Sequence, residues 1–244
     1  MANRRFRWCL LVLALLSASL LGTGCVTNGR QVLLKEYGPS VPALAGEPLK
    51  GATIFIKGFD CAPSLVSLDL KTPPEEPSPF SYMDFNSEQD KLWDKEMHAL
   101  QKKASRSDLR EIGNMRNGFG MVMSHVYALN DPAVWLAEGL KYDLEAQGAK
   151  VVDASQAAGA DITVSGTIQL CREDMYMVIN GELVVDLVVQ PGQRAPRRRQ
   201  MHTHGATAAM LASEGEYFHA LRDARQKFSI LATREIVDAF RPNR

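Results

Sequence analysis

The first 25 residues of the chain carry the pattern with the clearest chemical meaning. Three arginines lie within the first seven residues, an apolar run extends from Cys9 to Leu21, and small residues lead up to Cys25. At ~1.5 Å per residue this run makes a helix of about 20 Å, shorter than the ~30 Å hydrocarbon core of a bilayer. A basic start, a short apolar middle and small residues before a cleavage site are typical of a secretory signal peptide. The sequence therefore predicts an exported protein that loses residues 1–24.

The stretch Leu20–Cys25 (LLGTGC) resembles the lipobox of bacterial lipoproteins, in which the cysteine is lipidated and becomes the first residue. That family usually has leucine three residues before the cysteine, where this chain has Gly22. The resemblance implies several acyl chains on Cys25, and two or more acyl chains hold a protein stably on a membrane. Val26, in place of the aspartate that favours the inner membrane in enterobacteria, implies the outer membrane. The alternative is an ordinary cleaved signal with a structural Cys25.

Two further cysteines, Cys61 and Cys171, remain in the mature chain. In an oxidising envelope such a pair is a candidate disulfide. Strand alternation places Cys61 opposite the face of Ile54, and Cys171 opposite the face of Leu170, so both thiols are expected on the same side of the sheet. Two unpaired thiols are the alternative. No Cys/His spacing in the sequence supports a metal site.

The segment Arg116–Met121 (RNGFGM) is the candidate loop for a partner or ligand. Asn117, Gly118 and Gly120 permit left-handed backbone conformations, and Phe119 between them can point into the core or outward. A structural turn is the alternative interpretation. Anion binding is disfavoured, because the segment matches no phosphate-binding motif and the next helix is expected about ten residues later.

Other chemistry-bearing residues favour structural roles. His202 and His204 share one strand face, as two ligands of one metal would, but no third ligand follows nearby and solvated histidines are preferred. Arg194 and Arg197–Arg199 could meet lipid phosphates, although a charged hairpin that resists edge pairing is favoured. Six methionines are interpreted as core filler rather than as a binding groove: Met121, Met123, Met175, Met177, Met201 and Met210. The sequence has no GxSxG or HExxH motif, so it predicts no catalytic residue, no metal and no cofactor.

Hydrophobic periodicity indicates the elements that must position these residues. Residues 25–50, with three prolines, predict the lipidated cysteine and a flexible tether, and Ala52–Phe59 predicts a strand. Residues 60–116 lack a sheet pattern and are expected to form an irregular insertion with one polar helix, Ser87–Ala104. The tether and the insertion leave the remaining elements to build the core.

Those remaining elements alternate in type. Asp131 and Pro132 begin a helix that ends near Gly148. A short strand and three consecutive strands follow, and Ser213 and Glu216 form a capping box for the last helix. We expect a two-layer α+β domain over residues 51–241, with a mixed, mostly antiparallel sheet of about five strands and two amphipathic helices.

The chain resembles the YajG-like family of outer-membrane lipoproteins in three places: Arg116–Met121, the helix that contains Trp135 and ends in LEAQGAKV, and Val164–Gly166 (VSG). The resemblance implies location and fold more than activity, and it does not extend to residues 60–116. Removal of residues 1–24 leaves 25 basic and 28 acidic residues, a net charge of −3, which gives no reason to expect nucleic acid. Membrane contact is expected through the lipid anchor.

Together these features favour a non-catalytic lipoprotein on the periplasmic face of the outer membrane. We expect its domain to bind or support another component of the cell envelope, with an envelope protein as the partner. Two other functions remain open: an auxiliary lipoprotein of a lipid-transport system that holds an apolar ligand between sheet and helices, and an envelope hydrolase.

Overall fold

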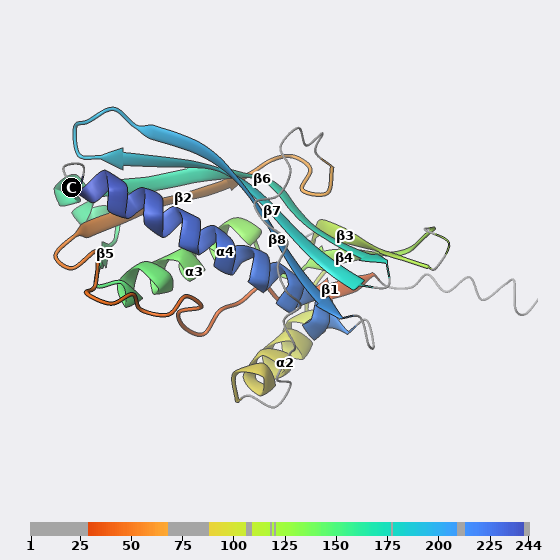
Figure 1. The fold of residues 1–244 in the computed structure, drawn as a ribbon. Helices are drawn as coiled ribbons and strands as arrows, with labels where there is room; N and C mark the ends of the chain where they lie inside the picture. Colours follow the sequence, from red (N-terminus) through yellow and green to blue (C-terminus); the bar gives the residue numbers. More distant parts are fainter. Residues whose placement is uncertain are drawn as a thin grey trace, which may run out of the picture.

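The computed structural model shows an α+β protein in which helices cover one face of a sheet (Figure 1). It describes residues 29–67, 88–105, 109–117, 119, 121–176, 178–208 and 213–241. The strands are β1 Arg30–Val32, β2 Thr53–Cys61, β3 Arg110–Arg116, β4 Val122–Ala128, β5 Lys150–Val152, β6 Ile162–Tyr176, β7 Val178–Pro191 and β8 Arg197–Ala208. The helices are α2 Glu88–Gln101, α3 Pro132–Ala146, the 3₁₀ turn η2 Ala154–Gly159 and α4 Glu214–Phe240. Within these residues no helix is long and apolar enough to cross a membrane.

Strand β6 is the hub of the sheet. Strand β7 pairs with it antiparallel along its whole length, and β8 pairs antiparallel with β7. The other edge of β6 is shared end to end by two strands, because β2 pairs with Ile162–Ile168 and β3 pairs with Glu173–Met175. Strand β5 extends the sheet from β2, and β4 and β1 extend it from β3. The α+β class is thus confirmed, and the described sheet has eight strands rather than about five.

The helix boundaries follow the capping signals of the sequence. The Asp131 side chain accepts a hydrogen bond from the backbone nitrogen of Ala133, and Pro132 opens α3 where its missing N–H costs nothing. Ser213 and Glu216 form the predicted reciprocal capping box of α4. Both helices then bury their apolar stripes against the sheet. The largest fully buried aromatic side chains in this layer are Trp135, Tyr217 and Phe228.

The tether prediction is wrong from residue 29 onward. Strand β1 joins the sheet beside β4, and the side chains of Leu33, Leu34 and Leu49 are almost completely buried. Asn130 holds this segment through two hydrogen bonds with the backbone of Leu34. This segment packs along the domain. The sequence did not predict this, because its apolar residues are irregularly spaced among prolines and glycines and follow no helical or strand period.

The described parts of residues 60–116, which are 60–67, 88–105 and 109–116, contain more regular structure than expected. Strand β3 lies in a stretch that was expected to lack sheet structure, and α2 confirms the polar helix. The Trp93 ring of α2 stacks on Phe218 with centroids 5.2 Å apart, and its Nε1 donates a hydrogen bond to the Leu33 carbonyl over 2.8 Å. Trp93 and Met97 therefore belong to the core, and α2 is not a surface decoration. The proposed N-cap Ser87 lies outside the described residues.

A buried ionic cluster joins α4, α3 and the N-terminal segment. The Arg225 side chain is fully buried; its Nε lies 3.0 Å from Glu36 Oε1 and its Nη1 lies 2.9 Å from Asp143 Oδ2. Arg225 also donates hydrogen bonds to the hydroxyls of Ser40 and Ser229. One guanidinium thus connects three segments that are far apart in the sequence, with both of its carboxylate partners buried.

Helix α4 lies unusually close to two strands. Gly181 of β7 and Gly205 of β8 are register partners beneath it. A Cβ atom on Gly205 would lie 2.6 Å from the backbone nitrogen of Ala224, and one on Gly181 would lie 2.5 Å from that of Leu221. Real Cβ atoms do not approach other atoms this closely. The missing side chains allow the helix backbone to rest directly on the sheet.

Two β-bulges turn both cysteines to the face of the sheet opposite to the one expected from the sequence. The register shifts between Ile56 and Gly58 in β2 and again at Gln169 of β6, and each shift reverses the alternation of side chains that follow. Cys61 and Cys171 therefore both pack on the core side, although they were expected on the opposite face.

The predicted disulfide between these cysteines is not formed, and both thiols are free. The Cα partner of Cys61 across the parallel pair is Ile168, three positions before Cys171. Gln169 is a bulge residue, so this offset is two register positions, or ~6.6 Å along the strand; with ~4.8 Å between the strands, the Cα atoms lie ~8 Å apart. A bridge requires Cα atoms within about 7 Å. Register, rather than facing direction, separates the two thiols.

We expect both thiols to react slowly in the folded protein. Burial, followed by the charge of Asp131, raises the pKa of Cys61 to about 11 from 9.0, so its thiolate population near pH 8 falls about a hundredfold. Burial raises the pKa of Cys171 as well. Iodoacetamide labelling followed by peptide mapping should modify Cys61 and Cys171 fully only after denaturation. A disulfide-linked peptide containing both residues would contradict the structure.

Candidate functional site

The segment Arg116–Met121 connects β3 to β4 in a hairpin. The side-chain oxygen of Asn117 accepts hydrogen bonds from the backbone nitrogens of Phe119 and Met121, each 3.0 Å long, and the Asn117 nitrogen donates to the Met121 carbonyl. Arg116 Nε lies 2.8 Å from Asp174 Oδ1 on β6. Gly118 and Gly120 lie outside the described residues. The local structure is a turn organised by an asparagine, as one of the two interpretations expected.

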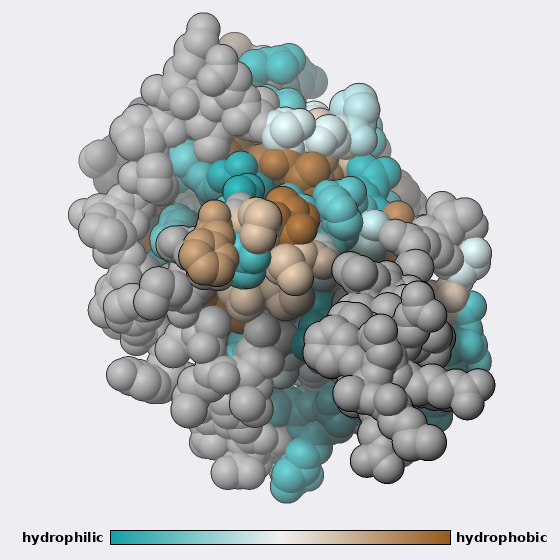
Figure 2. Space-filling view, turned by 90° about the vertical axis from the view of Figure 1, so that its right-hand side faces the viewer, coloured by the Kyte–Doolittle hydropathy of each residue, from teal (hydrophilic) through white to brown (hydrophobic). Residues whose placement is uncertain are grey.

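The tip of this hairpin is exposed and apolar. Phe119 has 90% of its surface exposed, and Met121, Val122 and Met123 have 58%, 46% and 55%. The register of β3 and β4 shifts here, because Ser124 pairs with Met115 and Val122 pairs with Arg116, so Met123 is an unpaired bulge residue next to the turn. Strand β1 pairs with β4 only from Val126 onward, and the tip extends beyond it. Figure 2 shows tan and brown side chains gathered on the face toward which the hairpin points in Figure 1.

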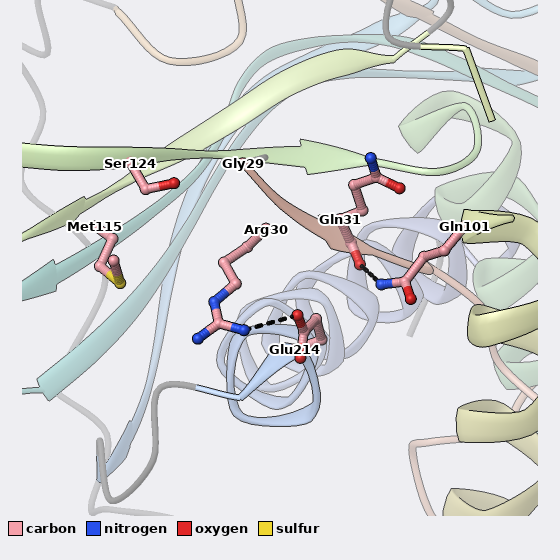
Figure 3. A pocket seen from close by; sticks show the side chains of 7 residues that line it. All are labelled: Gly29, Arg30, Gln31, Gln101, Met115, Ser124 and Glu214. Carbon is pink, nitrogen blue, oxygen red and sulfur yellow. Dashed lines mark hydrogen bonds and ion pairs between the residues drawn. The ribbon is translucent and has the colours of Figure 1, made fainter. Parts of the chain in front are cut away.

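A pocket of about 480 Å³ lies at the base of the hairpin (Figure 3). Its lining comes from β1, α2, β3, β4 and the first residue of α4, and the residues are Gly29, Arg30, Gln31, Gln101, Met115, Ser124 and Glu214. Arg30 Nη1 donates to Glu214 Oε1 over 3.0 Å, and Gln101 Nε2 donates to the Gln31 carbonyl. Met115 and Ser124 are cross-strand partners in the hairpin. The pocket has a largely polar lining, and its two charged side chains, Arg30 and Glu214, pair with each other.

A buried acid, Glu173, lies between the base of the hairpin and α4. Its register partner is Gly113 of β3, and its charge also acts on Tyr217 of α4. Neither carboxyl oxygen has a hydrogen-bond partner in the described structure. Complete burial raises the pKa of Glu173 well above 4.5, because the charged form loses its hydration.

We expect Glu173→Gln to stabilise the protein increasingly as the pH rises above about 4.5. The unfolded chain releases this proton near pH 4.5 while the folded chain keeps it, so the wild type loses up to ~1.4 kcal/mol of stability per pH unit in that window. Glutamine removes the titration and keeps the shape. Urea unfolding at a series of pH values should give equal stabilities near pH 4 and a growing advantage of the variant at neutral pH. Equal slopes for both proteins would show that Glu173 ionises in the fold.

Three solved structures show distant similarity to this fold. Protein XCC0632 from Xanthomonas campestris, described by the family model DUF330, is 10% identical and superposes with a TM-score of 0.49 over 87% of this chain and 97% of its own. An uncharacterized protein is 12% identical, with a TM-score of 0.46 over 81% of this chain and 99% of its own. The hypothetical protein CT253 from Chlamydia trachomatis is 8% identical, with a TM-score of 0.31 over 79% and 99%. No family model and no curated protein matches the sequence.

The two histidines share a strand face as expected, but each contacts a neighbouring strand. His202 Nε2 lies 2.7 Å from Glu182 Oε1, and His204 Nε2 lies 3.2 Å from Asn180 Oδ1. Burial, then the charge of Lys227, lowers the pKa of His204. His202 is buried rather than solvated. Across the described ranges, no group of three or more His, Cys, Asp or Glu side chains is arranged to hold a metal ion.

The arginine cluster at the β7–β8 turn contacts the end of α4. Arg199 Nη1 lies 2.8 Å from Glu235 Oε1, and Arg197 Nη2 lies 3.8 Å from Glu235 Oε2. Arg194 donates to the carbonyl of Ala239. These contacts fasten the hairpin to the helix, and they agree with the structural interpretation of the cluster.

The exposed methionines of the tip were misassigned to the core. Met201 is buried as expected, but Met121 and Met123 are largely exposed. Met177 and Met210 lie outside the described residues, as does the lipidation candidate Cys25. The available signal was the sequence FGMVM itself, a run of apolar residues beside glycines without the polar alternation of a half-buried strand.

Proposed function

We propose that the protein is a lipid-anchored lipoprotein of the outer membrane, related to the YajG-like lipoproteins, whose periplasmic domain binds another envelope component without catalysis. The observation that supports binding is the bare hairpin tip. Four of the nine large apolar side chains exposed in the described structure, Phe119 and Met121–Met123, lie on this one turn. Clustered apolar exposure of this kind marks an interaction site, whereas scattered single residues do not.

A carried apolar ligand finds less support in the described structure, because the pocket of about 340 Å³ between β2, β5 and α3 is lined by Glu138, Lys141 and Asp153 as well as by apolar residues. Trp135, Tyr217 and Phe228 fill the space between the sheet and the helices. The binding function therefore rests on the outer surface of the hairpin.

A photo-crosslinking amino acid at position 119 tests the binding function in intact cells. Position 134 is the matched control, because Val134 is also about half exposed but lies on α3, beyond the opposite end of β4. We expect position 119 to give a reproducible adduct with one envelope component and position 134 to give none. Equal labelling from both positions, or none from 119, would contradict the proposal.

The anchor is tested separately. Replacing Cys25 by serine removes the only thiol that the lipobox can lipidate, so we expect the protein to leave the membrane fraction or to keep its uncleaved signal. Fractionation with a high-salt wash and mass spectrometry of the N-terminus distinguish these results. A cleaved variant that still sediments with the outer membrane would disprove the lipid anchor.

A further inference from the structure

We propose that the tip of the β3–β4 hairpin enters the lipid surface to which the chain is anchored. This inference rests on the proposed lipidation of Cys25, and it names lipid as the component that the hairpin contacts. The tip side chains are Phe119, Met121, Val122 and Met123, all largely exposed to solvent. They are apolar and uncharged, as insertion at the boundary between headgroups and acyl chains requires.

The position of the chain where the described residues begin supports this occupant. Strand β1 runs parallel to β4 with Arg30 beside Val126, so the chain before Arg30 approaches from the side of the hairpin tip. A Cβ atom on Gly29 would lie 2.6 Å from the carbonyl oxygen of His125, which shows how closely the two segments pass. The N-terminal chain and the hairpin tip thus lie at the same end of the sheet.

Residue counts show that Cys25 and the hairpin tip can lie at similar distances from the end of the sheet at Gly29. Cys25 precedes Gly29 by four residues, and four residues span at most ~14 Å. Met121 likewise precedes His125, the neighbour of Gly29, by four residues, or ~14 Å of strand. If Cys25 carries acyl chains in a bilayer, Gly29 lies no farther from the lipid than about the distance by which the hairpin extends beyond Gly29. The bare tip then reaches the interface without any rearrangement of the fold.

The test uses the full-length lipidated protein in vesicles of phosphatidylethanolamine and phosphatidylglycerol, with a polarity-sensitive fluorophore attached at Phe119→Cys. Val134→Cys is the matched control, and a flotation assay reports the anchor independently. Brominated acyl chains quench only fluorophores that enter the bilayer, so we expect roughly twofold quenching at position 119 and none at position 134.

The outcomes separate this inference from the proposed function. Protein that floats with vesicles while position 119 stays unquenched would overturn the hairpin inference and leave the anchor intact; a protein adduct from position 119 in cells would then identify the hairpin as a protein-binding site. A fluorescence shift without vesicles that grows with protein concentration would also overturn it, by showing that a second copy covers the tip. Protein that neither floats nor shows quenching would contradict both the anchor and the insertion.

Discussion

Arg225→Met is expected to lower the free energy of unfolding by about 3–5 kcal/mol, because it takes the cation away from the buried Asp143 carboxylate and one of two cations away from Glu36, whose Oε2 also lies 3.1 Å from Arg222 Nε. Glu36 and Asp143 are each within 3.0 Å of this guanidinium, and neither is more than 3% exposed. Methionine preserves much of the volume and flexibility of the side chain, so the loss measures charge and hydrogen bonding more than packing. Urea unfolding at neutral pH, with the m-value checked for two-state behaviour, gives the quantity directly.

Arg199→Met is the matched control for this substitution. Its guanidinium lies 2.8 Å from Glu235, but its side chain is 44% exposed, so its loss should cost less than about 1 kcal/mol. Adding Asp143→Asn to Arg225→Met should restore part of the stability, because it removes the buried carboxylate charge that has lost its cation. Equal losses for the two arginine variants would show that the cluster does not hold the segments together.

Gly205→Ala should lower the free energy of unfolding by about 3 kcal/mol or more, nearly as much as Arg225→Met, although it adds a single methyl group. The new Cβ atom would meet backbone atoms of α4, at the carbonyl of Ala220 and the nitrogen of Ala224, and backbone cannot turn aside as a flexible side chain can. The helix must therefore move away from β8, which opens the packing beneath Leu221. A large fall in the thermal midpoint, measured by circular dichroism, is the expected result.

Gly38→Ala provides the comparison. A Cβ atom there has no other atom within 4 Å, so the change should alter stability by no more than about 0.5 kcal/mol. Gly181→Ala should reproduce the large loss, since Gly181 pairs with Gly205 beneath the same helix. A Gly205→Ala protein that unfolds at the wild-type temperature would show that α4 can shift without cost.

The sequence predicted best those features that depend on local chemistry. Asp131 and Pro132 marked the start of α3, and Ser213 with Glu216 marked the start of α4, because capping residues act on the backbone within one turn. The apolar stripe of α4 was visible for the same reason. Features that depend on pairing were less visible. Strand β3 (REIGNMR) alternates poorly, and its place in the sheet comes from its partners β4 and β6.

Long-range register explains the remaining errors. The bulges before Gly58 and at Gln169 reverse the facing of Cys61 and Cys171, and no composition signal marks the second of them. Leu33 and Leu34 were assigned to a tether, because nothing local indicates that Asn130 will hold them. The candidate loop was found through Asn117 and its glycines, whereas exposure of Met123 follows from where β1 stops pairing with β4.

The shared edge of β6 has a consequence for the order in which the chain acquires structure. Strands β1, β3 and β4 pair with one another and β2 pairs with β5, but these two groups join into one sheet only through β6, which begins at Ile162. In contrast, β6, β7, β8 and α4 follow one another in the chain and contact their immediate neighbours in the sheet. Contacts between distant segments form slowly because long loops must close first. The edges of β2 and β3 that pair with β6 therefore stay open until β6 is synthesised, and the apolar residues of β2 depend on protection from aggregation until this last third of the chain has emerged.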